Sequence, residues 1–235
     1  MRNQTNKLKI IAILFLSFIV FTSSVMALQT STEMRTIKKG KFTLNFICKS
    51  ADFSEEINQK LINTFFEVYP TLVKTYNKKS PKVVTFVVDP EYDGVAATSD
   101  DKVIFSVKYM SSHPGDIDVV THEVMHIVQA YGQHSGMPGW VTEGIADYVR
   151  YAYGIDNAGA GWRLPDLSEK HNYQNSYRIT ARFFAWLEIN HKGIIQKLDQ
   201  AGRDKTYGDG AIWKKLTGKT IDELWSDYSK RPALS

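Results

Sequence analysis

The segment that most restricts the fold of this chain contains two histidines four residues apart, His122 and His126, with Glu123 between them. On a helix, this spacing places both imidazoles on one face, about one turn apart, where they can bind a single small ion. Apolar residues surround them on most sides of such a helix: Val119, Val120, Val124, Met125, Ile127 and Val128. A helix of this kind is buried, so its histidines and its glutamate require polar partners or an ion.

The residues that follow this helix supply such partners. Gly132 and Gly136 flank a short loop, and Pro138 suits the first turn of a second helix. Glu143 lies about a turn and a half into that helix, where its carboxylate can reach the same ion, and Asp147 lies one turn further on the same face. Asp147 can accept the outward N–H of one histidine and fix its tautomer. The alternative, in which Asp147 replaces Glu143 as the third ligand, remains open at this point.

This set of residue types favours metal-assisted hydrolysis. A zinc ion held by such ligands lowers the pKa of its bound water towards about 7. A carboxylate beside that water, here Glu123, can take its proton as the water attacks a carbonyl. The alternative interpretation is an amphipathic helix whose histidines and glutamate are exposed to solvent. It does not agree with the apolar residues that flank them on most sides of the helix. The pattern therefore predicts a Zn²⁺ site built on His122 and His126, with Glu123 as the candidate catalytic base and Glu143 or Asp147 as the third ligand.

A second motif is better explained by helix capping. Gly218-Lys219-Thr220 resembles the end of a phosphate-binding loop, but the position five residues before Gly218, which requires glycine, is Trp213. We predict instead that Gly218 ends one helix and that Thr220 forms a capping box with Glu223 for the next.

The order of the expected elements predicts an α+β fold. Alternating or β-branched patterns indicate strands within 41–50, 81–92 and 101–110, the last of them an edge strand. A helix over about 52–76 has Asp52 as its expected N-cap, and a kink or a restart is expected at Pro70. Further helices are expected at about 116–131, 138–153, 175–191, 194–201, 209–216 and 221–230. Strands first and helices afterwards give a sheet-containing lobe and a helical C-terminal lobe.

The N-terminus has the pattern of a cleaved secretory signal over residues 1–27, with an apolar run too short to span a membrane. Residues 28–40 are expected to form a flexible extension, and 41–235 a single domain. Without the signal's three basic residues, 26 Lys and Arg remain against 25 Asp and Glu, a net charge of +1. This balance gives no electrostatic reason to expect nucleic acid or a membrane surface as the partner. We expect a monomer that is secreted or periplasmic, with no membrane span after signal removal.

Four stretches together resemble the basic secretory protein family of zincin-like peptidases, of the gluzincin type with H-E-x-x-H and a downstream glutamate. They are PGDIDVVTHEVMHIVQAYG, PGWVTEGIADYVRYAYG, SYRITARFFAWLE and LTGKTIDELWSDY. The resemblance implies a zincin-like fold with a small mixed sheet, an edge strand over the active-site helix, zinc at His122, His126 and Glu143, and catalysis by Glu123. Tyr177 matches a tyrosine position of the family.

The sequence therefore predicts a secreted zinc metallopeptidase that hydrolyses peptide or protein substrates. Tyr177 could donate a hydrogen bond to the oxyanion of the tetrahedral intermediate, or it could pack with Phe183 and Phe184 in the core. His171 is a weaker alternative donor. Two other functions remain open: a secreted binding module on the same scaffold, and a non-proteolytic zinc amidase acting at the cell wall.

Overall fold

The computed structural model describes residues 33–132 and 135–234. The expected signal peptide, residues 1–27, lies outside the described residues, as does the first part of the expected extension. Within the described ranges, no helix is both long and apolar enough to cross a membrane.

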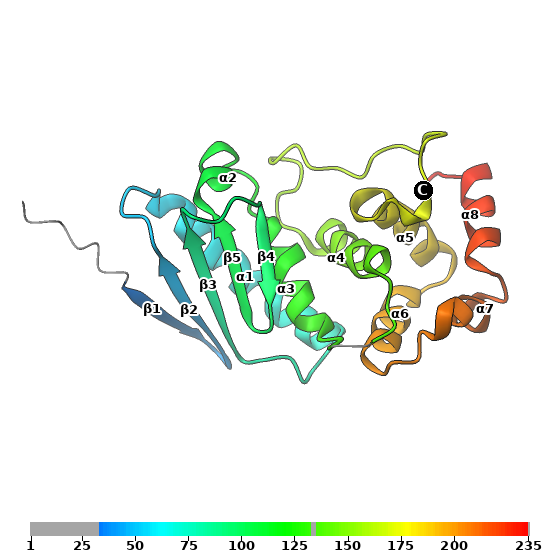
Figure 1. Ribbon diagram of the computed structural model, residues 1–235, viewed down its shortest axis with the longest axis horizontal. Helices are drawn as coiled ribbons and strands as arrows, with labels where there is room; N and C mark the ends of the chain where they lie inside the picture. Colours follow the sequence, from blue (N-terminus) through cyan, green and yellow to red (C-terminus); the bar gives the residue numbers. More distant parts are fainter. Residues whose placement is uncertain (1–32, 133–134, 235) are drawn as a thin grey trace, which may run out of the picture.

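A five-stranded mixed sheet forms one side of the molecule (Figure 1), in the order β1-β2-β3-β5-β4. The outer pairs are antiparallel and the two inner pairs are parallel. Its strands are β1 (Met34–Lys39), β2 (Phe42–Cys48), β3 (Val83–Asp89), β4 (Ala96–Ser99) and β5 (Lys102–Ser106). The mixed sheet expected from the family resemblance is thus present.

Strand β1 corrects the expectation of a flexible extension through Gly40. Met34 to Lys39 pair antiparallel with β2, from Met34 opposite Ile47 to Lys39 opposite Phe42. The side chains of β1 are exposed or half-buried, so they carry no apolar alternation that would reveal a strand. Backbone hydrogen bonds to β2 stabilise the strand. The side-chain pattern of a sequence contains no information about such backbone bonds.

The expected edge strand is also corrected. β5 lies inside the sheet, between β3 and β4, and buries Val103 and Phe105. The edge is β4, whose sequence AATS is short and has no apolar alternation. The expected strand also ends earlier than predicted, because the Ser106 side chain accepts a hydrogen bond from the Tyr109 amide and starts helix α2 (Val107–Ser112).

Helix α1 (Glu55–Thr75) packs its apolar face on the sheet, where Phe65 meets Phe86 of β3 with ring centroids 5.4 Å apart. Its N-cap is Ser54, whose side chain accepts from the Ile57 amide, and not Asp52 as expected. The helix also continues through Pro70 without a break. Burial of the helix face along its full length outweighs the hydrogen bond that proline removes.

The remaining helices follow the sequence expectations to within a few residues. They are α3 (Val119–Gln129), α4 (Gly139–Tyr153), α5 (Tyr177–Asn190), α6 (Ile194–Arg203), α7 (Ala211–Thr217) and α8 (Ile221–Lys230). Gly218 ends α7 in the left-handed conformation, and Thr220 and Glu223 form the predicted capping box of α8. Figure 1 shows α3 between the sheet and the C-terminal helices, and α3 packs against α1, α4 and β4.

Helices α4 and α5 approach closely at Gly144. A Cβ atom on Gly144 would lie 2.3 Å from Cγ2 of Thr180 and 3.0 Å from a ring carbon of Phe184. Thr180 and Phe184 are fully buried, so neither side chain can move away freely. Glycine is therefore required here for the contact that holds the two helices together.

We predict that Gly144→Ala lowers the free energy of unfolding by about 1–3 kcal/mol, because the added methyl group overpacks this contact. Urea unfolding followed by circular dichroism would measure the change. Gly139→Ala is the matched control, since nothing lies within 4 Å of a Cβ atom at that position. Equal stability of the two variants would contradict the requirement for glycine at the α4–α5 contact.

Candidate metal centre

Three side chains from two helices converge on one point. Nε2 of His122 lies 3.1 Å from Nε2 of His126, both on α3. Oε2 of Glu143, on α4, lies 3.3 Å from Nε2 of His122 and 3.5 Å from Nε2 of His126. These three residues form a group that could hold a metal ion.

The spacing of these atoms fits one tetrahedral ion. Zinc binds imidazole nitrogen and carboxylate oxygen at about 2.0–2.2 Å, so two ligand atoms of a tetrahedral site lie about 3.3 Å apart. The three distances in this cluster, 3.1, 3.3 and 3.5 Å, bracket that value. Two nitrogens and one oxygen also match the donor types that zinc accepts. The residues present therefore fit a metal of this size.

The outward nitrogens of both histidines have acceptors. Nδ1 of His122 lies 2.7 Å from Oδ1 of Asp147, and Nδ1 of His126 lies 2.7 Å from Oε1 of Gln129. The amide nitrogen of Gln129 donates to the Thr142 carbonyl, which orients its oxygen toward His126. A carboxylate or amide oxygen cannot donate here, so the hydrogen of each neutral ring is on Nδ1. The lone pairs on both Nε2 atoms are then free for an ion.

Gln129 was missed by the sequence analysis. It lies three residues after His126, a spacing at which helix side chains are neighbours, and this spacing could have pointed to it. Asp147 contacts the far side of the His122 ring from the cluster, so the geometry favours Glu143 over Asp147 as the third member.

The cluster holds an excess of negative charge. Burial lowers the pKa of His122, but hydrogen bonds to Asp147 and Glu143 outweigh burial and raise it to about 10. Burial raises the pKa of Glu143, but the two histidines outweigh this effect and hold it well below its usual range. Both shifts indicate that a positive charge between His122 and the Glu143 carboxylate is favoured. A bound cation meets that requirement.

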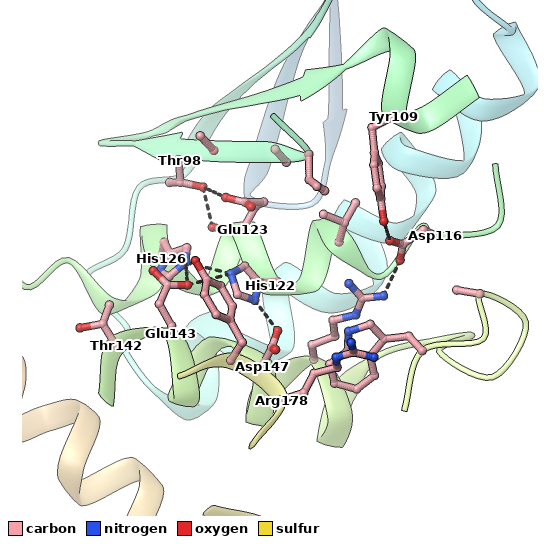
Figure 2. Close-up of a pocket in the computed structure, with 18 of the residues that line it drawn as sticks. Thr98, Tyr109, Asp116, His122, Glu123, His126, Thr142, Glu143, Asp147 and Arg178 are labelled. Atoms are coloured by element: carbon pink, nitrogen blue, oxygen red, sulfur yellow. Dashed lines mark hydrogen bonds and ion pairs between the residues drawn. The ribbon is translucent and has the colours of Figure 1, made fainter. Parts of the chain in front are cut away.

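Glu123 projects toward the edge strand. It is only 5% exposed, and its Oε2 atom accepts a hydrogen bond of 2.7 Å from the Thr98 hydroxyl on β4. The same hydroxyl lies 3.0 Å from the Glu123 carbonyl. Figure 2 shows Glu123 beneath Thr98, beside the cluster of His122, His126 and Glu143. Thr98 was missed by the sequence analysis, because only the pairing of β4 in the sheet brings it to α3.

Tyr177 lies at the start of α5 with its side chain over the cluster. It is 55% exposed, and its ring is parallel to that of His122 with centroids 6.2 Å apart. Its φ of +46°, after a φ of +66° at Ser176, is unusual for residues other than glycine. The position contradicts the alternative that Tyr177 packs in the core with Phe183 and Phe184. The nearby Glu143 carboxylate raises the pKa of Tyr177, so its hydroxyl keeps its proton.

All six sequence-predicted site residues line one cleft of about 1090 Å³: His122, Glu123, His126, Glu143, Asp147 and Tyr177. The cleft runs beneath β4, whose residues Ala96 to Thr98 form its upper wall. His171, the weaker alternative donor, is not among the lining residues.

Comparisons with known proteins agree with this architecture. A family model described as a peptidase of plants and bacteria matches residues 41–228. An aminopeptidase N family protein from Idiomarina loihiensis has a similar structure, with a TM-score of 0.52 and 10% identity over 83% of this chain and 46% of its own. Aminopeptidase A from Legionella pneumophila, solved with aspartic acid, has a TM-score of 0.51 and 14% identity over 83% of this chain and 27% of its own.

These neighbours show the fold. The expected α+β, zincin-like fold is confirmed, although the chain spans less than half the length of either neighbour. A search among curated proteins finds no match.

We predict that Gln129→Leu weakens the binding of a divalent metal by about 10- to 100-fold, because His126 loses the acceptor that fixes its tautomer and orientation. Competition with a chelating dye would measure the affinity. Gln196→Leu, at an exposed position on α6, is the matched control. Unchanged affinity in Gln129→Leu would show that His126 does not depend on this contact.

Proposed function

This chain belongs to the family of peptidases of plants and bacteria, and from that membership we propose that it is a zinc-dependent metallopeptidase. The observation that carries the proposal is the triangle of Nε2, Nε2 and Oε2 atoms at tetrahedral spacing, with a buried carboxylate beside it. His122, His126 and Glu143 would hold the zinc. The Nδ1 atoms of His122 and His126 have hydrogen-bond acceptors in Asp147 and Gln129. Histidine ligands of a metal usually have such an acceptor for the nitrogen that does not bind the ion.

When bound, zinc supplies a Lewis acid that polarises the scissile carbonyl and makes a water molecule more acidic. Glu123 acts as the general base: it takes the proton from the attacking water and returns it to the leaving amine. The hydrogen bond from Thr98 holds Oε2 of this carboxylate, and among the described residues no hydrogen bond engages Oε1. One oxygen is therefore anchored while the other is available for the proton.

Tyr177 is proposed to stabilise the oxyanion of the tetrahedral intermediate. Its ring faces His122 across the cleft, and its hydroxyl keeps its proton near neutral pH, as a hydrogen-bond donor must. The ring is partly exposed and sits on a segment with positive φ. A residue packed only for stability would not require this strained backbone.

The substrates proposed are peptides or proteins, which could extend along β4 by backbone hydrogen bonds. Export of the chain is supported by the sequence pattern of residues 1–27. That the chain acts as a monomer is a separate part of the proposal. The amino-terminal residue of the purified protein, determined by mass spectrometry, tests the export signal.

Metal content and hydrolysis of an unfolded protein test the central proposal. We predict about one zinc per chain in the wild type, with hydrolysis abolished by a chelator and restored by zinc. Glu143→Ala should lose most of the zinc.

Glu123→Gln should retain zinc and lose hydrolysis by a factor of at least about 1000, because it removes the general base. Hydrolysis retained in Glu123→Gln would contradict the mechanism, and zinc without hydrolysis in the wild type would favour a binding module or an amidase.

For Tyr177→Phe we expect kcat to fall by about 100-fold, with little change in KM or zinc content, because the lost donor acts on the transition state. Tyr151→Phe is the control, since Tyr151 is exposed and does not line the cleft. An unchanged kcat in Tyr177→Phe would exclude Tyr177 as the oxyanion donor.

A further inference from the structure

Arg178 stands out among the charged residues of the cleft. It follows Tyr177 at the start of α5, lines the same cleft as the metal cluster, and is exposed. Among the described residues, no ion pair or hydrogen bond engages its side chain. Its guanidinium is therefore available to a ligand that enters the cleft.

The other arginine of the cleft, Arg150, has a structural role instead. It is 5% exposed, donates to the carboxylate of Asp116 and to the side-chain oxygen of Asn157, and lies over the ring of Trp162. Tyr109 also donates to Asp116, so this carboxylate has two donors. Arg178 is thus the one arginine lining the cleft that has no ion pair or hydrogen bond among the described residues.

The position of Arg178 relative to β4 indicates which end of a bound peptide would lie beside Arg178. Figure 2 shows Tyr109, Asp116 and Arg178 toward one end of the cleft, and His126 and Thr142 toward the other. The carbonyl of Val95, which precedes β4, accepts a hydrogen bond from the amide of Ser106, at the start of α2. The amino end of β4 therefore lies at the end of the cleft that contains Tyr109, a residue of α2.

A peptide that adds to the free edge of β4 in the antiparallel sense, the commoner pairing, runs in the opposite direction. Its carboxyl-terminal part then lies at the amino end of β4, beside Arg178. Its scissile bond lies over the metal cluster, since Thr98 and Glu123 mark that point of the strand. Arg178 would meet the part of the substrate downstream of the bond that is cleaved.

We propose that Arg178 binds a carboxylate of the substrate on the carboxyl-terminal side of the scissile bond. This inference rests on the proposed peptidase function and names its substrate class. A guanidinium group forms bidentate hydrogen bonds with a carboxylate, and this geometry makes arginine selective for carboxylates. The carboxylate can come from an aspartate or glutamate side chain, or from the free carboxyl terminus of a short peptide.

The test uses three fluorogenic peptides that differ only downstream of the cleaved bond: glutamine with a carboxyl-terminal amide, glutamate with the amide, and glutamine with a free carboxyl terminus. We expect the wild-type, zinc-loaded protein to prefer at least one carboxylate peptide over the neutral one by roughly tenfold in kcat/KM. The second and third peptides separate the two sources of the carboxylate. In Arg178→Gln the ratio should fall toward one, and Arg178→Lys should retain part of it.

Arg163→Gln is the matched control, because Arg163 is exposed and does not line the cleft but its replacement removes the same charge. Its preference should equal that of the wild type. A wild type with no preference for either carboxylate peptide, or an undiminished preference in Arg178→Gln, would overturn the proposal.

Binding separates this proposal from the proposed function. Fluorescence anisotropy with zinc-loaded Glu123→Gln gives the Kd of the same peptides without turnover. We expect the same ratio of about tenfold, lost when Arg178→Gln is added. If the wild type hydrolyses no peptide, the peptidase proposal fails, and the binding ratio still decides the role of Arg178.

Discussion

The buried contact between His122 on α3 and Asp147 on α4 is the interaction on which the site depends. A carboxylate 2.7 Å from Nδ1 places the hydrogen on that nitrogen and leaves Nε2 free. The same contact joins the two helices, so Glu143, one turn before Asp147, reaches the same point. The side-chain oxygen of Gln129 likewise places the hydrogen of His126 on Nδ1 and leaves its Nε2 free. The two helices thereby hold three ligand atoms with unshared lone pairs within reach of one ion.

The two other sides of the cleft come from more distant parts of the chain. Strand β4 approaches α3 as the edge of the sheet, and Thr98 holds the carboxylate of Glu123 from that side. Helix α5 packs on α4 through Gly144, whose missing side chain leaves room for Thr180. This close contact sets the start of α5, and with it Tyr177 and Arg178, along the opposite wall. The metal cluster and the side chains on the opposite wall of the cleft are thus positioned by separate packing interactions.

The sequence was sufficient for features that depend on local spacing. His122 and His126 share a helix face because they are four residues apart, and the capping box of Thr220 and Glu223 follows from a three-residue spacing. It was insufficient for β1 and β4, whose exposed or short strands are stabilised by backbone pairing with neighbours and show no apolar alternation. The sequence also did not separate Ser54 from Asp52 as the N-cap of α1, since both residue types suit that position. The expected restart at Pro70 does not occur, because burial of the helix face outweighs a local preference of about 3 kcal/mol.

By itself, the sequence indicated the family through four motif stretches, the α+β class through periodicity, and the members of a candidate metal cluster through the donor chemistry of a few side chains. Only the tertiary structure decided that β4 and not β5 is the edge, that Thr98 and Gln129 contact Glu123 and His126, and that Tyr177 faces the cleft. It also decided that Arg150 is paired with Asp116, while no ion pair within residues 33–132 and 135–234 engages Arg178. The physical reason is that these facts depend on contacts between residues far apart in the chain, which neither helical nor strand periodicity encodes.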